Sequence, residues 1–271
     1  MECLKSNLFR KLFCPQSVYE RRLAISAFWA NKFDYVVQYG PLRGFKLSES
    51  PVWSSGDLAP KLFGLYEQQV MSVLQQFSAT KRILIDCGAA DGYYAVGAVA
   101  RGIFDRCIAY EMDERARDLL SNLATINGVR DAVEVNGAVD SQTLLRLGSD
   151  ILDESVLLVD IEGGEFDLLT DSVIDKLRLT HCIVELHPWV FDDGLSNVEN
   201  LKSTFSESHV VRSIGFGPRD LSVFAELARV NDDDRWLVAS EGRGQCMEWL
   251  VCVPKGSAHR IRDGVQHSVT D

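Results

Sequence analysis

The chain has 271 residues, of which 46% are hydrophobic and 25% charged, a balance that is ordinary for a globular protein. Its formal net charge of −11 argues against nucleic acid as the main partner, because binding to a phosphate backbone requires a basic face. The sequence has no apolar run of the roughly 20 residues that a transmembrane helix needs, and its first residues lack the uninterrupted apolar core of a secretory signal. We therefore expect a cytoplasmic protein with no transmembrane segment.

Residues 1–56 are predicted to form a small N-terminal extension. The pattern indicates a helix over residues 16–32 and then a hairpin, whose two short strands flank "GPLRG" at residues 40–44. Residues 1–32 carry six lysines and arginines against two glutamates, so this segment is suited to contact an acidic surface. A homodimer formed through the extension is one such contact. A solvated helix packed on the main domain is the alternative that we favour.

Residues 57–271 are predicted to form the main domain. It begins with one helix, which Asp57 or Ser55 can cap and which runs to about residue 77. From residue 82 onward strands and helices alternate, a pattern that builds a mostly parallel sheet with helices on both faces. The expected strands are 83–85, 107–110, 132–135, 156–161, 182–186, 210–213 and 249–253. The first helix between them ends near residue 99, and the later ones span 114–126, 166–177 and 197–206.

Charged side chains stand where four of these predicted strands end. They are Asp86, Glu111, Asp160, Glu162, Glu185 and His187. In an open α/β sheet, ligands bind at the carboxyl ends of the strands. Gathered carboxylates repel one another and are costly to desolvate, so a sheet that served stability alone would not collect them. The sequence therefore predicts a binding crevice at this edge of the sheet.

The turn after the first strand indicates a nucleoside ligand. Gly88 and Gly92 let the backbone approach a ligand closely, and the helix that follows offers unpaired N–H groups. An acid at the end of the second strand, Glu111, is placed to accept hydrogen bonds from two ribose hydroxyls. The glycine spacing does not match the G-x-G-x-x-G fingerprint of dinucleotide binding, and the chain has no P-loop.

Four stretches extend this interpretation to a family. "IDCGAADG" resembles the first motif of class I S-adenosylmethionine-dependent methyltransferases. Together with "AYEMDERARDLLSNLATINGV", "LLVDIEGGEFDLL" and "IVELHPWV", it resembles the successive motifs of FkbM-type methyltransferases, including their Asp-x-Glu-Gly-x-Glu signature. The resemblance covers residues 39 to about 190, with Gly-Gly-Glu at 163–165 in place of the more usual Gly-Ala-Glu. It implies a Rossmann-like class I methyltransferase fold with a mostly parallel seven-stranded sheet.

The resemblance also implies a cofactor, S-adenosylmethionine, which becomes S-adenosylhomocysteine after transfer. In that family pattern the turn after the first strand faces the methionine part, with Tyr94 beneath it. Glu111 binds the ribose, while Met112 and Ala138 border the adenine. The positions that match are Asp86, Gly88, Ala90, Gly92, Tyr94, Glu111, Met112, Ala138 and Asp160.

Methyl transfer is an in-line displacement in which the protein aligns the nucleophile and removes a proton. Our preferred base is His187, which lies two residues beyond Glu185 and so points to the same face. Asp160 and Glu185 would orient the substrate and the imidazole. Asp160 is the other candidate base, and a structural His187 next to Pro188 is the alternative for the histidine.

The acceptor is predicted to be a hydroxyl on a small molecule. The Asn/Asp-Pro-Pro-aromatic tetrad of amino-group methyltransferases is absent, and FkbM-type relatives commonly methylate hydroxyls of sugars or natural products. A divalent metal held by Asp160, Glu162 and His187 is an alternative, but nothing in the sequence enforces ligand geometry, so we expect no metal. The helix dipole accounts for Glu165 in the first turn of the following helix.

Two other functions are alternatives to this prediction. An NAD(P)-dependent oxidoreductase is disfavoured by the glycine spacing. A non-catalytic scaffold that binds S-adenosylmethionine is disfavoured because the acids and glycines of the cofactor motifs are present. Residues 215–245 are predicted to form part of a lid over the acceptor pocket, with Arg219, Arg235 and Trp236 as candidate acceptor contacts.

Overall fold

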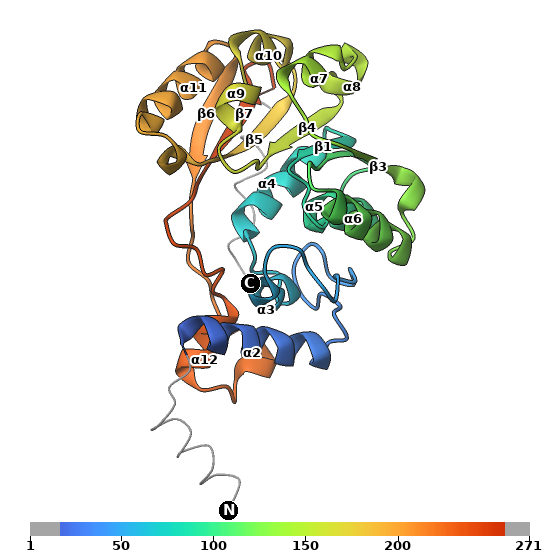
Figure 1. The fold of residues 1–271 in the computed structure, drawn as a ribbon, viewed down its shortest axis with the longest axis vertical. Helices are drawn as coiled ribbons and strands as arrows, with labels where there is room; N and C mark the ends of the chain where they lie inside the picture. The colour runs from blue at the N-terminus through green and yellow to red at the C-terminus, as the bar shows by residue number, and fades with distance from the viewer. Residues whose placement is uncertain (1–16, 258–271) are drawn as a thin grey trace, which may run out of the picture.

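The computed structural model describes residues 17–257, whose strands form one seven-stranded sheet (Figure 1). The strand order is β3-β2-β1-β4-β5-β7-β6. β1 to β5 pair in parallel, whereas β7 runs antiparallel to both of its neighbours. The strands are β1 (Ile83–Cys87), β2 (Arg106–Tyr110), β3 (Val133–Asn136), β4 (Ser155–Val159), β5 (His181–Leu186), β6 (His209–Ile214) and β7 (Glu248–Pro254). This arrangement confirms the predicted Rossmann-like methyltransferase fold.

Helices cover both faces of the sheet, because successive residues of each buried strand point to opposite sides. Leu84, Val156 and Ile183 belong to one core, and their neighbours Ile85, Leu157 and Val184 belong to the other. The first core is covered by α4 (Gln68–Ser78), α5 (Tyr93–Ala100), α6 (Glu114–Ile126) and the N-terminal extension. The second core is covered by α7 (Ser141–Arg146), α8 (Ser149–Asp153), α10 (Asp171–Lys176) and α11 (Gly194–Ser208).

The N-terminal extension packs against the main domain. Its helix α2 (Val18–Lys32) starts at a capping box formed by Ser17 and Glu20. It lies beside α12 (Asp232–Val238), at the end of the molecule far from α10 (Figure 1). Trp29 and Phe45 join the first core. The predicted homodimer contact stays a prediction, as does the boundary at residue 56, and residues 1–16 lie outside the described part of the chain.

Three predicted elements differ from the structure. The hairpin is reduced to a single antiparallel bridge between Val36 and Lys46. The helix expected up to residue 77 is divided into α3 (Leu58–Leu62) and α4, because Gly64 and Glu67 adopt positive φ angles of 65° and 42°. The helix expected over 166–177 is likewise divided into α9 (Glu165–Leu168) and α10, which begins where the Thr170 hydroxyl caps it.

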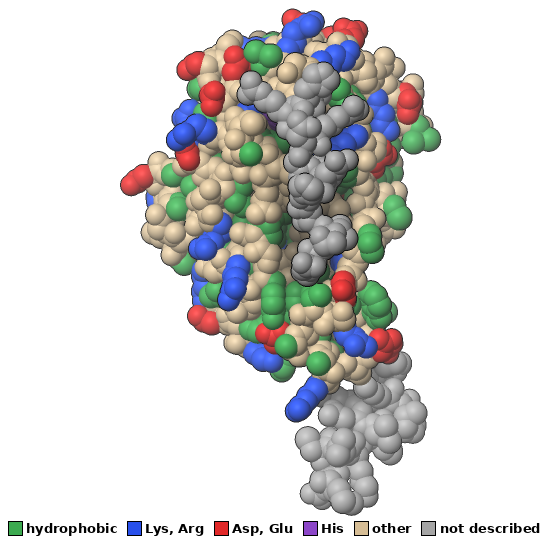
Figure 2. Space-filling view, turned by 180° about the vertical axis from the view of Figure 1, so that it is seen from behind, with side chains coloured by type: hydrophobic (Ala, Val, Ile, Leu, Met, Phe, Trp, Pro, Cys, Tyr) green, Lys and Arg blue, Asp and Glu red, His purple; other side chains and the backbone are tan. Residues whose placement is uncertain are grey.

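The surface gives no single charged face in the view from behind. Acidic and basic side chains are interspersed among the described residues visible there (Figure 2). None of the helices within residues 17–257 has the length and apolar character needed to cross a membrane.

Candidate functional site

A cavity of about 850 Å³ opens at the carboxyl ends of the parallel strands. Four of its wall segments directly follow β1 to β4, and Glu185 of β5 adds a fifth contribution. Trp53 of the N-terminal extension and Asp57, which directly follows it, also line the cavity, and the segment before β7 adds Glu241 and Arg243. A volume of this size is in the range of pockets that bind cofactors and drug-sized ligands.

Strand alternation explains why the acidic side chains meet on one side of the sheet. Asp86 shares a face with Leu84, and Glu185 shares a face with Ile183, both of which lie in the core covered by the N-terminal half. Asp160 continues the same alternation after β4. Because these strands are parallel neighbours, their ends bring the side chains together.

The turn after β1 requires glycine for close approach. Gly88 has a φ of 92°, and a Cβ atom there would lie 1.7 Å from the backbone oxygen of Asp160. Ala90 also adopts a positive φ, of 47°. This strained conformation is held by a hydrogen bond from the Ala90 N–H to Glu111 Oε2 at 2.8 Å. The turn is therefore pressed against β4 on one side and tied to β2 on the other.

Glu111 is a buried acid whose carboxylate is fixed by backbone groups. Its Oε1 accepts a hydrogen bond from the Asp113 N–H at 2.8 Å, and its Oε2 accepts the one from Ala90. Each oxygen keeps a further lone pair, since a carboxylate has about four acceptor sites. Because Glu111 also lines the cavity, it is preorganised to accept hydrogen bonds from a ligand.

Most of the residues predicted to bind the cofactor line this cavity. They are Gly88, Ala90, Tyr94, Glu111, Met112, Ala138 and Asp160. Met112 is 80% exposed and stands at the wall of the cavity. Tyr94 donates its hydroxyl hydrogen bond to Glu67.

Asp86 and Gly92 are absent from the described wall of the cavity and lie behind it. Asp86 is buried, and its Oδ2 has no hydrogen-bond partner among the residues that the structure describes. Burial, together with the nearby charges of Asp160 and Glu111, raises the pKa of Asp86 to about 8. Gly92 serves packing, because a Cβ there would lie 2.8 Å from a methyl group of Val96.

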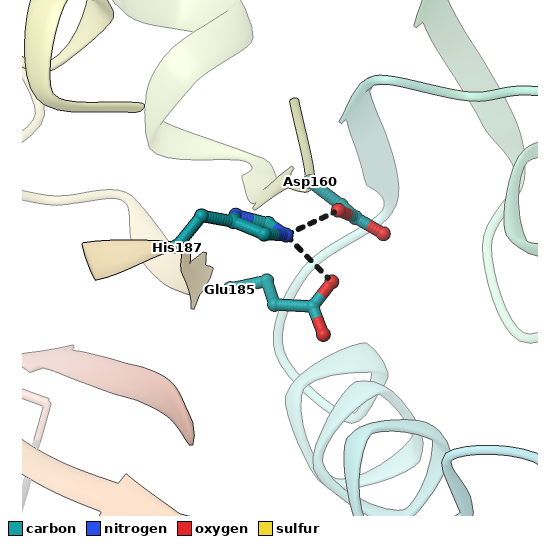
Figure 3. A group of neighbouring side chains, drawn as sticks. All are labelled: Asp160, Glu185 and His187. Carbon is teal, nitrogen blue, oxygen red and sulfur yellow. Dashed lines mark ion pairs between the residues drawn. The ribbon is translucent and has the colours of Figure 1, made fainter. Parts of the chain in front are cut away.

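His187 lies at the centre of a group of carboxylates. Its Nε2 is 3.7 Å from Glu185 Oε2 and 3.8 Å from Asp160 Oδ1, and both acids come toward it from neighbouring strands (Figure 3). Glu162 Oε2 is 3.5 Å from the same nitrogen. The His187 side chain is only 1% exposed and is not among the residues that line the cavity, whereas Asp160 and Glu185 are. The histidine therefore stands behind the two acids.

Glu165 fixes the orientation of His187. It is fully buried, and its Oε1 accepts a hydrogen bond from the His187 backbone N–H at 2.7 Å and lies 3.3 Å from the ring Nδ1. Its Oε2 accepts a hydrogen bond from the Gly163 N–H. The helix dipole is therefore an insufficient account of Glu165, because a carboxylate that served the dipole alone would stay in solvent. The Asp-x-Glu-Gly-x-Glu pattern was the sequence signal for this role.

The titration behaviour of the group follows from burial and crowding of like charge. Burial raises the pKa of Asp160, and burial together with the charge of Asp160 raises the pKa of Glu185. Burial alone would lower the pKa of His187, but the hydrogen bond and charge of Glu165, with Asp160 and Glu162 nearby, raise it overall. Protons are therefore retained in this group at pH values where isolated carboxyl groups would have lost them.

Arg243 is the main feature of the wall that the sequence did not reveal. It forms ion pairs with Glu67, with Glu185 at 2.8 Å and with Glu241 at 2.9 Å. These partners are the residue that precedes α4, a residue of β5 and one in the segment before β7, and no local motif joins them.

The predicted lid contacts have other roles, since none of them belongs to the described lining of the cavity. Arg219 is paired with Glu241, Arg235 with Asp232, and the Trp236 ring is exposed. Only the end of the 215–245 segment, at Glu241 and Arg243, reaches the cavity.

Comparisons with known proteins find similar solved structures only. No protein-family model matches the chain, and no curated protein matches it. Among solved structures, an O-methyltransferase from Bacillus cereus in complex with S-adenosylhomocysteine is 13% identical, with a TM-score of 0.45 over 92% of this chain and 96% of that one. The O-methyltransferase TomG from Streptomyces achromogenes, involved in tomaymycin synthesis and solved with S-adenosylmethionine, is 13% identical, with a TM-score of 0.47 over 91% and 94%.

A third similar structure is that of an enzyme with a different kind of substrate, a tRNA. The M1A22 tRNA methyltransferase TrmK from B. subtilis is 13% identical, with a TM-score of 0.43 over 73% of this chain and 70% of that one. At these identities and TM-scores the similarities identify neither a substrate nor an activity for this chain.

Proposed function

We propose that the protein is an S-adenosylmethionine-dependent methyltransferase that methylates a hydroxyl group of a small molecule such as a sugar or a natural product. The observation that carries the proposal is the cavity at the carboxyl edge of the sheet. One part of its wall offers tightly held backbone and the preorganised Glu111, and another part offers Asp160 and Glu185. The more specific FkbM-type assignment rests on the sequence motifs.

The residues of this chain fit the cofactor. The turn at Gly88 packs directly on the backbone of Asp160, where any side chain would collide, and this closely packed turn lines the cavity. Glu111 would accept hydrogen bonds from the ribose hydroxyls through its remaining lone pairs. Met112, exposed and at the wall, would cover the adenine together with Ala138.

When bound, S-adenosylmethionine supplies a methyl carbon that the acceptor oxygen attacks, so that the carbon–sulfur bond breaks and S-adenosylhomocysteine is left. In this chain Asp160 and Glu185 face the cavity and would orient the acceptor. The proton of the hydroxyl must leave as the new carbon–oxygen bond forms. Because His187 lies behind the two acids, it would receive a proton through them and not by direct contact with the acceptor.

Binding measurements test the cofactor. Calorimetric titration should show that S-adenosylmethionine and S-adenosylhomocysteine bind one per chain and that NADH does not bind. Glu111→Gln should weaken S-adenosylhomocysteine at least tenfold, or about 1.4 kcal/mol, because an amide loses acceptor sites and presents N–H groups to the Ala90 and Asp113 donors.

The matched control is Glu134→Gln, on β3 and outside the described cavity wall, which should bind as the wild type does. Binding of NADH in place of the adenosyl ligands would indicate the oxidoreductase. Binding without methyl transfer to any acceptor in a cell extract supplied with labelled S-adenosylmethionine would indicate the scaffold.

A further inference from the structure

We propose that Asp160, Glu185 and His187 bind a divalent metal ion at the wall of the cavity, with Glu162 as an additional ligand. From the sequence a divalent metal at Asp160, Glu162 and His187 is only an alternative, because residue spacing does not define ligand geometry. The structure supplies that geometry. One carboxylate oxygen from each acid and one imidazole nitrogen all lie within 4.8 Å of one another.

The separations are those of ligands around an ion and not of hydrogen bonds. His187 Nε2 lies 3.5, 3.7 and 3.8 Å from oxygens of Glu162, Glu185 and Asp160. Hydrogen bonds from ring nitrogens to oxygen are usually about 2.7–3.2 Å long, and all three of these contacts are longer than the 3.3 Å that joins His187 Nδ1 to Glu165 Oε1. Two atoms bonded to one ion at about 2.1–2.2 Å, and separated by about 110–120° at the ion, lie about 3.4–3.8 Å apart.

Two of the atoms proposed to bind the ion, His187 Nε2 and Asp160 Oδ1, also lack hydrogen-bond partners among the described residues. His187 is 99% buried, and its Nε2 is directed at the carboxylates without a hydrogen bond among the described residues (Figure 3). The Asp160 Oδ1 atom is buried and has no hydrogen-bond partner within residues 17–257. Buried polar atoms are seldom left in this state, so the uncommitted lone pairs of these two atoms are suited to bind a cation.

Glu165 adds a second, independent feature of a metal site. Metal-binding histidines usually donate their other ring N–H to a carboxylate, which fixes the tautomer and leaves the free nitrogen to the metal. The buried Glu165 lies 3.3 Å from Nδ1 and also accepts the His187 backbone N–H. Nε2 is then the nitrogen with the free lone pair.

The local charges favour a divalent ion. Four carboxylates surround His187, namely those of Asp160, Glu162, Glu165 and Glu185. Among the described residues, the positive charge of Arg243 is paired with Glu185 but is shared with Glu67 and Glu241. A set of one imidazole and two or three carboxylates suits a transition ion such as Mn²⁺ better than Ca²⁺ or Mg²⁺, which prefer oxygen alone.

The role of the ion rests on the proposed function. Because Asp160 and Glu185 line the cavity, an ion between them and His187 can be reached by an acceptor. A hydroxyl bound to a divalent ion loses its proton to solvent more readily, and its oxygen is then ready to attack the methyl carbon. His187 would act as a ligand in this arrangement and not as the base.

Mn²⁺ titration of the full chain tests the site in the absence of any adenosyl ligand. After treatment with a chelator, the protein should remove one Mn²⁺ per chain from the free-ion electron paramagnetic resonance signal. Pulsed spectra should show coupling to one histidine nitrogen, which His187→Gln abolishes. Glu185→Gln should weaken binding at least tenfold. Glu162→Gln, at an exposed side chain whose replacement spares the core, should weaken it about three- to tenfold.

Asp167→Asn is the matched control, since it removes the same charge from the same cavity wall outside the group around His187. It should change affinity less than twofold. Absence of stoichiometric binding, absence of nitrogen coupling, or equal losses in Glu162→Gln and Asp167→Asn would overturn the proposal, leaving a protonated His187 among carboxylates. If Glu185→Gln does not fold, Glu162→Gln and the nitrogen coupling decide. Calorimetry with S-adenosylhomocysteine is independent, so failure of the metal site and failure of the cofactor proposal can be distinguished.

Discussion

The two halves of the cavity wall are built in different ways. Around β1 and β2, the wall consists of short segments that directly follow a strand, and the key acid, Glu111, is held by backbone N–H groups. Around β5 and the segment before β7, the wall depends on ion pairs between distant side chains. Arg243 joins Glu67 and Glu185 there, two residues that the sequence keeps far apart.

This difference teaches where each half is vulnerable. The half at β1 and β2 depends on backbone geometry, so it should fail when a turn cannot adopt its conformation. The half at Arg243 depends on charge balance, so it should fail when one charge of a buried group is removed and the others are left uncompensated. Variants of each kind can break or sharpen the comparison.

Gly88→Ala should have the largest effect. The added Cβ would lie 1.7 Å from the backbone oxygen of Asp160, at a φ of 92° that alanine rarely adopts. Either the turn or β4 must move, so we expect the free energy of unfolding to fall by at least about 3 kcal/mol. S-adenosylhomocysteine binding should be lost. Urea unfolding and calorimetry measure the two effects.

Gly102→Ala separates backbone strain from collision. Gly102 also has a positive φ, of 67°, but no atom lies within 4 Å of a Cβ built there. Only the conformational strain of about 1 kcal/mol should appear, with ligand binding intact. Equal losses in the two glycine variants would contradict the close approach of the β1 turn to β4 as the reason for Gly88.

Arg243→Met should have the second-largest effect. It keeps the apolar stem but leaves Glu67, Glu185 and Glu241 without their shared cation. Because the Arg243 side chain is 18% exposed, some solvent reaches the group, and we expect a loss of about 2–4 kcal/mol in urea unfolding at pH 8. The loss should shrink as the pH falls, since burial raises the pKa of Glu241 to about 7 and this carboxylate then takes up a proton.

Arg235→Met is the control for Arg243. Arg235 pairs with the exposed Asp232 on α12, and exposed pairs contribute little to stability, so its loss should be below about 1 kcal/mol. If the two arginine variants were equally stable, the wall at Arg243 would not depend on charge balance.

The same division explains what the sequence could predict. Strand and helix periodicity located the elements of the sheet, and the order of acids at strand ends predicted a crevice at one edge, where Glu111, Asp160 and Glu185 line the same cavity. The local sequence was sufficient to predict these positions, because each acid lies at or just beyond the end of its own strand. Nothing local pairs Arg243 with Glu185, because that contact depends on how the segment before β7 crosses the sheet edge.

How deeply a side chain lies behind the cavity wall also could not be predicted from the sequence. Asp86 and His187 were expected at the ligand surface, yet among the described residues both lie behind the cavity wall. A strand pattern gives the face to which a side chain points but not how many layers cover it. The break between α9 and α10 was missed for a related reason, because a continuous apolar stripe masked the capping Thr170.

The smallest expected effect is the change in pH slope caused by Asp86→Asn, about 1.4 kcal/mol per pH unit. Asp86 tests the division itself, because it lies in the half at β1 and β2 yet is a buried acid whose Oδ2 has no partner among the described residues. Its pKa is about 8 in the folded chain and near 4 when unfolded, so the folded state holds one more proton between those values. That contribution to stability is complete below about pH 4 and is lost as the pH rises to 8, at about 1.4 kcal/mol per pH unit. Unfolding at pH 6 and 7 should therefore show a fall that is about 1.4 kcal/mol smaller in Asp86→Asn than in the wild type, whereas exposed Asp118→Asn should keep the wild-type slope. If Asp86→Asn left the slope of unfolding free energy against pH unchanged, backbone donors would keep Asp86 ionised, as they hold Glu111. Backbone hydrogen bonds would then determine the behaviour of every acid in the half at β1 and β2, in spite of the burial of Asp86.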